Sequence, residues 1–412
     1  MTGQPAPHTA RPAPGPPPPP TASSPTASSP LARHAARLGL ALAGRLDSGG
    51  SESVCALLRD DTGTRYVLKY LEAGADRVDG HGLGTFRAKE RQQRYLAAAA
   101  PRAAARYLPV LHSEHGQGWS AYLLPYSPYP SLADTGRTVA ESDFTGLLST
   151  VLGSLVTDGY TTGCRPADRD LWRTLYLERL PRRRWILRRH LPADLWQDSV
   201  VVNGRRVATM EPLCRAANAP RIAALFADSR LSVPVHGDLN LRNILADPHP
   251  RDDPAFHLID PRGTLQPWDV VYDLAKMLFT LTLFDDTMRG GCAIASPGPG
   301  EYTVALSEPS GLRHALPGFL GLLPRVWSGL AAGGLGEGPW LPRLLLAHAS
   351  HVLAESACRL SDRAAPPATR LNRALGLHLY GLVLFDDLLR RLDGHGPVDP
   401  VEHLKAAASY LP

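Results

Sequence analysis

The feature that most constrains this chain is a set of polar residues placed around one short hairpin. Asn243 follows the Asp238 of a His-Gly-Asp sequence by five residues, and Asp260 comes seventeen residues after Asn243. Residues 244–245 and 256–259 are predicted strands because they are apolar and enclose a turn-rich segment. If positions that sum to 503 face each other in an antiparallel hairpin, Asn243 and Asp260 lie at its open end.

These three side chains supply what phosphoryl transfer from ATP to a hydroxyl requires. Asp238 is available to accept a proton, whereas the amide of Asn243 and the carboxylate of Asp260 suit Mg²⁺. Such transfer depends on positioning and on charge neutralisation. The alternative is a surface hairpin that carries Asp and Asn because turns favour these residues.

Three motifs resemble those of the aminoglycoside phosphotransferase and choline kinase-like family, whose members are relatives of protein kinases. The motifs are HGDLNLRN at 236–243, IDPRG at 259–263 and WDVVYDLA at 268–275. The resemblance implies a protein-kinase-like fold with two lobes. The first motif has glycine where protein kinases have arginine, which favours a small-molecule acceptor over a protein.

The resemblance also implies a role for individual residues. Asp238 would be the catalytic base, and Asn243 and Asp260 would hold the metal ion. His236 and Asp273 would brace the catalytic loop without reacting.

A glycine- and serine-rich segment near the amino terminus is a candidate phosphate-binding loop, formed by Ser48, Gly49, Gly50 and Ser51. Glycines let backbone N–H groups approach phosphate oxygens, although such sequences also form ordinary turns. Lys69 follows in a predicted hairpin. If the residue numbers of facing positions sum to 123, Lys69 faces Val54. The chain has four lysines and 40 arginines, so a lysine here indicates a site for a compact ammonium. A solvent-facing lysine is the alternative.

Glu90 and a later proline-tyrosine pair are further candidates for the nucleotide site. Glu90 lies on a predicted helix, where the resemblance implies a pair with Lys69. An i,i+4 pair with Arg94 on a solvated face is the alternative. The resemblance also implies that Pro125 and Tyr126 form the hinge whose backbone contacts adenine.

The second half of the chain is predicted to be mostly helical. Residues 270–284 form a strongly apolar helix, and the Gly- and Pro-rich residues 285–309 are predicted to be a loop that borders the acceptor site. Asp269 and Asp273 are spaced i,i+4. They are either a second metal site or, as we prefer, a helix cap and a loop anchor.

An arginine cluster lies between the predicted hinge and the catalytic loop and consists of Arg179, Arg182, Arg183, Arg184, Arg188 and Arg189. A solvated helix face is one interpretation. If the cluster lines the acceptor pocket instead, its charge disfavours a polycationic aminoglycoside and favours a neutral or anionic hydroxyl compound.

Composition narrows the class of protein. The 412 residues are 44% apolar, and the net charge of +5 comes from one arginine-rich segment, so nucleic-acid binding is not indicated. Five widely spaced cysteines without a CxxC pair favour reduced thiols in a cytoplasm. No apolar run approaches the ~18 residues of a membrane span, and no secretory signal begins the chain. No obligate protein partner is evident.

We therefore predict an α+β, two-lobed kinase-like fold. Residues 1–34 are a disordered Pro/Ala/Ser-rich tail, 35–124 a mostly β lobe that binds ATP, and 125–412 a helical lobe with the catalytic loop, metal site and acceptor pocket. The predicted function is ATP- and Mg²⁺-dependent phosphorylation of a hydroxyl on a small molecule. The alternative is a nucleotide-binding pseudoenzyme that acts through a partner or RNA. Protein phosphorylation is disfavoured because no Ala-Pro-Glu-like segment follows Asp260.

Overall fold

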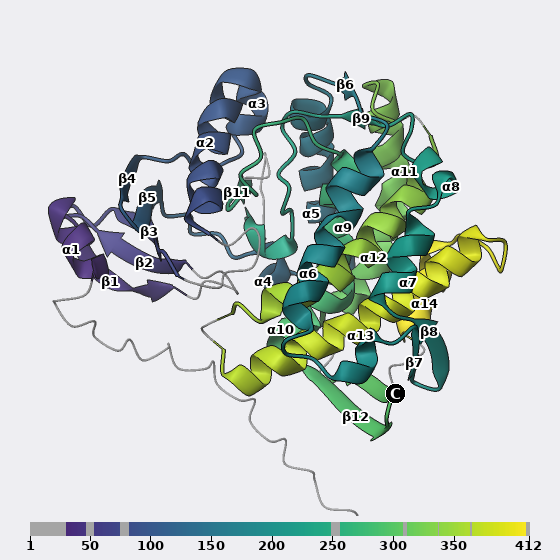
Figure 1. Cartoon of the computed structure of the whole chain (residues 1–412). Coiled ribbons are helices and arrows are strands. Elements are labelled where there is room, and N and C mark those ends of the chain that lie inside the picture. Colours follow the sequence, from purple (N-terminus) through teal and green to yellow (C-terminus); the bar gives the residue numbers. More distant parts are fainter. Residues whose placement is uncertain are drawn as a thin grey trace, which may run out of the picture.

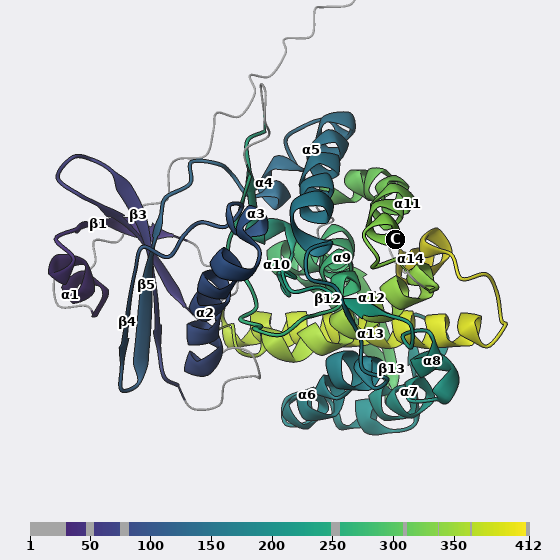
Figure 2. The ribbon, with the colours of Figure 1, turned by 90° about the horizontal axis from the view of Figure 1, so that it is seen from above.

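The chain folds into a small lobe dominated by strands and a large helical lobe (Figures 1 and 2). The structure is a computed structural model, and it describes residues 30–46, 53–74, 82–248, 256–307, 311–336, 338–362 and 365–408. This architecture confirms the predicted α+β class and the order of the two lobes. Within the described residues, no helix combines enough length with enough apolar character to cross a membrane.

The amino-terminal lobe is built on an antiparallel sheet with the strand order β1-β2-β3-β5-β4. Its strands are β1 (Ala41–Leu46), β2 (Val54–Arg59), β3 (Arg65–Glu72), β4 (His112–Gly116) and β5 (Trp119–Pro125). Helix α2 (Leu83–Ala99) packs against β3 and β5 through the buried Phe86, and α3 (Pro101–Ala104) follows it. Lys69 is on the central strand β3, so strands β2 and β5 flank it on either side.

The register of β2 on β3 differs from the predicted register by one residue. Lys69 lies opposite Cys55 on β2 and opposite Tyr122 on β5, so the predicted partner Val54 was wrong. The observed register pairs Ala56 with Leu68, and both side chains belong to one buried cluster. A shift of one residue would turn one of them to the other face of the sheet, because side chains alternate along a strand.

A short helix, α1 (Pro30–Arg37), covers part of this sheet. Its Leu31 and Ala35 are buried with Leu58 and Leu68 of the sheet. The predicted boundary at residue 34 therefore falls inside a helix that belongs to the folded lobe. Residues 1–29, which make up the rest of the predicted disordered tail, lie outside the described residues.

The carboxy-terminal lobe is organised around helix α9 (Val270–Phe279), in which every residue is buried. The helical path continues through residues 280–284, which confirms the predicted apolar helix. Helix α12 packs against α9 and along the length of α13. The other helices of this lobe are α4 (Leu132–Thr135), α5 (Glu141–Ser154), α6 (Arg179–Leu187), α7 (Met210–Ala217), α8 (Pro220–Ala224), α10 (Asp285–Gly290), α11 (Leu316–Ala332), α12 (Trp340–Arg359), α13 (Pro367–Leu392) and α14 (Pro400–Ala408).

The region predicted as a loop at 285–309 was assigned wrongly. It contains α10 and a hairpin of β12 (Cys292–Gly298) and β13 (Glu301–Leu306), which joins β7 (Ser199–Val202) and β8 (Arg205–Ala208) in a four-stranded sheet. Tyr302, Val304 and Leu306 alternate with more exposed residues. The Gly and Pro content of the segment obscured this alternation of buried and exposed residues, which is the pattern that indicates a strand. Short strand pairs β6 (Arg165–Pro166) with β9 (Arg230–Leu231), and β10 (Ile244–Ala246) with β11 (Phe256–Leu258), complete the lobe.

Two buried histidines make the stability of the fold sensitive to acid. His378 and His403 are fully buried, and burial lowers the pKa of each imidazole to about 3. Their unfolded pKa is 6.5, so stability is complete above that pH and is lost progressively as pH falls toward 3. At pH 5 each histidine is expected to lower the free energy of unfolding by about 2 kcal/mol.

Thermal melts between pH 7.5 and 5 would test this expectation. The melting temperature should fall steeply below pH 6.5, and His378→Leu should flatten that fall. A variant whose melting temperature keeps the pH dependence of the natural chain would contradict the assignment of His378 as one of the buried histidines responsible, which also include His236, His348 and His351.

Candidate active site

A cavity of about 1070 Å³ lies between the two lobes. Its walls combine residues of β2, β3 and α2 with residues of the 236–268 segment and of helices α6, α9, α10 and α12. Asp238, Asn243, Asp260 and Lys69 all line it. The structure therefore brings together residues that are up to 191 positions apart in the sequence.

The loop that carries Asp238 is held by hydrogen bonds from its own backbone. The carboxylate of Asp273 on α9 accepts the backbone N–H groups of His236 and Gly237, at 2.8 Å each. Gly237 has φ +78°, and a Cβ there would lie 2.7 Å from the Cβ of Arg262, so only glycine fits. Asp273 thus anchors the loop, as predicted.

His236 has a bracing position rather than a reactive one. Its Nδ1 accepts the backbone N–H of Asp238 at 3.2 Å, and its Nε2 lies 2.9 Å from the carbonyl oxygen of Ile259. Burial lowers the pKa of the imidazole to about 4. A neutral ring with its proton on Nε2 satisfies both contacts and joins the catalytic loop to the second motif.

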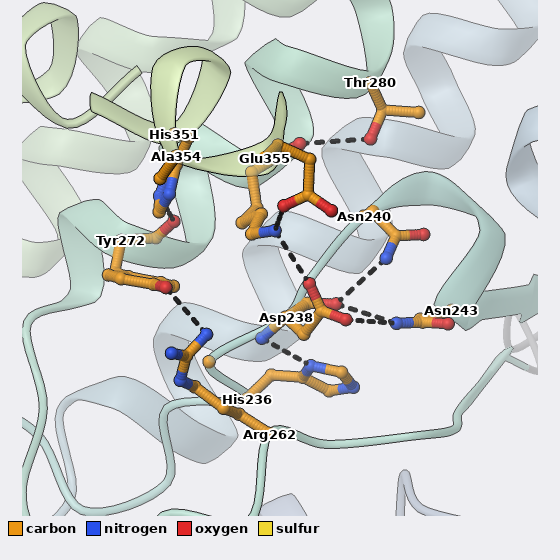
Figure 3. Close-up of polar contacts among 12 residues, drawn as sticks. His236, Asp238, Asn240, Asn243, Arg262, Tyr272, Thr280, His351, Ala354 and Glu355 are labelled. Carbon is orange, nitrogen blue, oxygen red and sulfur yellow. Dashed lines mark hydrogen bonds and ion pairs between the residues drawn. The ribbon is translucent and has the colours of Figure 1, made fainter. Parts of the chain in front are cut away.

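The carboxylate of Asp238 is held by a different partner on each oxygen (Figure 3). Its Oδ1 lies 3.1 Å from Nζ of Lys276, and its Oδ2 lies 3.4 Å from Nδ2 of Asn243. Nδ2 of Asn243 also donates to the main-chain oxygen of Asp238 at 2.8 Å. Burial alone would raise the pKa of Asp238, but Lys276, together with Lys89 and His236, leaves the pKa below its usual value.

Asp260 is the second charged centre of the cavity. Its Oδ1 accepts from Nζ of Lys69 at 3.0 Å and from Nζ of Lys89 at 2.7 Å. Burial opposes ionisation, but the two ammonium groups hold the pKa of this carboxyl well below its usual range. Asp260 has φ 58°, a conformation that few non-glycine residues adopt and that often marks functional sites.

Comparison with known proteins identifies the family. The sequence profile of the phosphotransferase enzyme family matches residues 42–303, which is well over half of the chain. The chain belongs to the phosphotransferase enzyme family. It is therefore a member of a family of enzymes that transfer phosphoryl groups.

Solved structures with similarity to this family member are distant in sequence. A Thermobifida fusca protein described as a fructosamine-3-kinase is 15% identical, with coverage of 85% of this chain and 98% of that chain and a TM-score of 0.41. An aminoglycoside-3'-phosphotransferase of type VIII is 17% identical, with coverage of 74% and 97% and a TM-score of 0.38. The streptomycin and ADP complex of a Streptomyces rimosus aminoglycoside phosphotransferase is 19% identical, with coverage of 57% and 79% and a TM-score of 0.33. No curated protein matches the sequence.

The hairpin between the two metal motifs has a register that differs by one residue from the predicted register. Ile244 pairs with Leu258, so Asn243 faces Ile259, whose N–H donates to the Asn243 carbonyl at 3.0 Å, rather than Asp260. This register places the buried Ile244 and Leu258 on the same face. Asn243 and Asp260 still lie at the same open end of the hairpin.

Glu90 does not pair with Lys69. Its carboxylate lies 2.8 Å from Arg94 and 3.1 Å from His115, and it accepts from the hydroxyl of Ser113 at 2.7 Å. The i,i+4 pair with Arg94 is therefore present, but Glu90 is buried rather than placed on a solvated face. Lys89, the preceding residue on α2, reaches the cavity instead, because adjacent positions of a helix are rotated by about 100°.

The other predicted nucleotide contacts are only partly described by the structure. Ser48, Gly49, Gly50 and Ser51 lie outside the described residues. Pro125 ends β5 and has no N–H, and the N–H of Tyr126 donates to the carbonyl of Arg65 at 3.2 Å. The side chain of Tyr126 lines the cavity, next to Leu124 and Ser127. Neither residue therefore has a backbone N–H that is free of the sheet.

The pair Asp269 and Asp273 is structural, in agreement with the preferred interpretation. Asp269 caps α9 by accepting the N–H of Val271 at 3.1 Å, and it also binds Arg343 at 3.0 Å. Burial raises the pKa of Asp273 to about 7. Both carboxylates are enclosed by hydrogen bonds of the carboxy-terminal lobe and are not among the lining residues of the cavity.

Some arginines of the cluster form a solvated helix face, as one interpretation predicted, whereas one arginine lines the cavity, as the other predicted. Arg182, Arg188 and Arg189 are exposed, and Arg184 pairs with Glu211. Arg179 and Arg183 are buried because they lie on the opposite face of α6. Arg183 lines the cavity and donates to the carbonyl of Ala354 at 2.7 Å.

Sequence reasoning missed Lys89, Lys276, Glu355 and Arg359, all of which line the cavity. Lys276 bridges Asp238 and Glu355, at 3.1 Å from each carboxylate. The scarcity of lysine was the available signal. Three of the four lysines line this cavity, and each contacts Asp238 or Asp260.

Proposed function

We propose that the chain transfers the γ-phosphoryl group of ATP to a hydroxyl group of a small molecule. The observation that carries this proposal is the pair of carboxylates in one cavity between the lobes. Asp260 is held by lysines of the amino-terminal lobe, and Asp238 is held by a lysine of the carboxy-terminal lobe. This separation supports a metal-nucleotide contact at Asp260 and a proton acceptor at Asp238.

Asp238 would orient the acceptor hydroxyl and take its proton. Its two oxygens have different neighbours, which fixes the direction of the carboxylate toward the cavity. Lys69 and Lys89 would bind phosphate oxygens, because both line the cavity, Lys69 buried and Lys89 partly buried, and both already hold an anionic partner. The hydroxyl of Ser127 and the ring of Tyr126 would lie beside the base of the nucleotide.

Asn243 and Asp260 fit an ion of the Mg²⁺ type. Mg²⁺ prefers oxygen ligands and takes one or two from protein when phosphates and water supply the rest. Nδ2 of Asn243 is committed to Asp238, and Figure 3 shows its amide oxygen on the side away from Asp238. When bound, the ion neutralises phosphate charge.

The acceptor is proposed to be a neutral or anionic hydroxyl compound rather than a polycationic aminoglycoside. Arg183 of the arginine cluster lines the cavity, and Arg262, Arg289 and Arg359 line it as well. Cationic walls repel ammonium groups in a partly desolvated cavity.

ATP turnover tests the proposed function. The purified chain is expected to bind Mg²⁺·ATP and to hydrolyse it slowly to water, and EDTA should abolish this hydrolysis until Mg²⁺ is restored. A screen of small hydroxyl compounds should then find acceptors that increase ADP release and take up ³²P from γ-labelled ATP. Nucleotide binding without turnover under any of these conditions would contradict the proposal. That result would favour the alternative, a nucleotide-binding protein that acts through a partner or RNA.

A further inference from the structure

The lining of the cavity has a strong excess of positive charge. Its described residues include nine lysines and arginines but only four carboxylates. Three of the cations (Lys69, Lys89 and Arg91) belong to the amino-terminal lobe, where the nucleotide is proposed to bind. Six belong to the carboxy-terminal lobe, which are Arg183, Arg242, Arg262, Lys276, Arg289 and Arg359. The acceptor side is therefore positive even when the nucleotide side is set aside.

The carboxylates on the acceptor side are already paired. Glu355 accepts from Arg359 at 2.7 Å on Oε1 and from Lys276 at 3.1 Å on Oε2. Asp134 accepts from Arg137 at 2.7 Å. An acceptor with an ammonium group would have to displace one of these cations, and displacing a buried cation from its partner is unfavourable.

Several arginines on this side have donor groups that no carboxylate accepts, although Nη2 of Arg359 does donate to Glu355. Arg359 is only 3% exposed, and its Nη1 faces the sulfur of Met288, a weak acceptor, at 2.8 Å. Its Nε has no hydrogen-bond partner. Among the described residues, Arg262 and Arg289 have no carboxylate within 4.0 Å, the limit for an ion pair. Nη1 of Arg262 donates to the hydroxyl of Tyr272 at 2.8 Å. Guanidinium donors that no carboxylate accepts thus line the same cavity as Asp238.

We propose that the acceptor carries an oxyanion, a carboxylate or a phosphate, in addition to its hydroxyl group, and that Arg359 and Arg262 recognise it. This inference rests on the proposed function and names the class of its acceptor. The planar guanidinium group forms paired hydrogen bonds with either oxyanion. Trp268, Phe279 and Phe284 supply apolar wall for the carbon skeleton.

Binding of matched probes tests the sign of charge that the site prefers. Glucose, glucosamine, glucuronate and glucose 6-phosphate have one ring scaffold and differ in charge. Each is titrated calorimetrically into the full chain saturated with Mg²⁺ and a non-hydrolysable ATP analogue, which keeps the nucleotide site filled. We expect glucuronate or glucose 6-phosphate to bind at least tenfold more tightly than glucosamine and glucose. The comparison of these two anions distinguishes a carboxylate site from a phosphate site.

Two variants and one control connect this preference to the named residues. Arg359→Met and Arg262→Gln are each expected to weaken binding of the preferred anion about tenfold or more and to leave glucose unchanged. Arg205→Met removes an arginine that pairs with Asp387 at 3.0 Å, outside the cavity, and should leave the preference intact. If Arg359→Met does not fold, Arg262→Gln still decides the outcome.

The inference is overturned if glucosamine or glucose binds as tightly as both anions, including the case in which none of the four binds measurably. It is also overturned if the anion preference survives in both cavity variants. Failure of the proposed function has a different signature, because the natural chain would then show no Mg²⁺·ATP turnover with or without a probe, whether or not it binds the nucleotide.

Discussion

Replacing Asp238 by alanine is expected to abolish phosphoryl transfer and to leave nucleotide binding intact. A positioned base contributes about 10² to 10⁴ in rate, so turnover should fall by about 10³-fold. Lys276 keeps its second partner, Glu355, at 3.1 Å, so the variant should fold. The rate is measured by γ-³²P transfer to an acceptor or to water, and nucleotide affinity is measured by calorimetry with Mg²⁺·ATP.

Asp238→Asn is the matched control for this prediction. It keeps the shape of the side chain and a contact with Asn243 but cannot take a proton. We expect it to be as inactive as the alanine variant. Turnover near the natural rate in either variant would refute the assignment of Asp238 as the base.

Replacing Lys276 by methionine should give the second-largest loss. We expect turnover to fall by about 10- to 100-fold, with the affinity for Mg²⁺·ATP changed less than about threefold. The ammonium of Lys276 holds Oδ1 of Asp238 and separates this carboxylate from that of Glu355. Without it, the partly exposed carboxylate of Asp238 and the buried carboxylate of Glu355 repel each other, and Asp238 loses one of the contacts that set its direction.

Lys276→Arg and Arg205→Met separate this positioning role from a purely structural one. The arginine variant retains the charge and should recover part of the turnover number. The Arg205 variant also loses an ion pair, with Asp387, but it should lose stability only. A Lys276→Met protein that melts at a lower temperature yet turns over ATP at the natural rate would show that the residue serves only the fold.

Local features of the sequence were sufficient for the catalytic loop and its anchor. The His-Gly-Asp motif indicated the loop, and the spacing of Asp269 and Asp273 indicated a cap and an anchor, although the anchoring bonds from His236 and Gly237 to Asp273 span 37 and 36 residues. The buried helix α9 was equally predictable, since ten consecutive buried positions need a strongly apolar segment. The rarity of lysine in the sequence was also enough to single out Lys69.

Strand registers could not be predicted to the residue. Both hairpins differ by one position, because the choice depends on which face packs against the rest of the lobe. The same limit applies to the segment at 285–309. Its strand β13 is stabilised by pairing with β7, which lies about one hundred residues earlier in the chain.

The amino-acid sequence was enough to indicate the family, the two lobes and the candidates Asp238, Asn243 and Asp260, because motif and periodicity are local properties. Tertiary packing, in contrast, determines which charged side chains form ion pairs. Lys276 contacts Glu355, 79 residues away, and Lys89 rather than Glu90 reaches Asp260, 171 residues away. Such ion pairs depend on how helices and strands pack, and no local pattern specifies a partner at that separation. The excess of positive charge along the cavity follows from these packed charges.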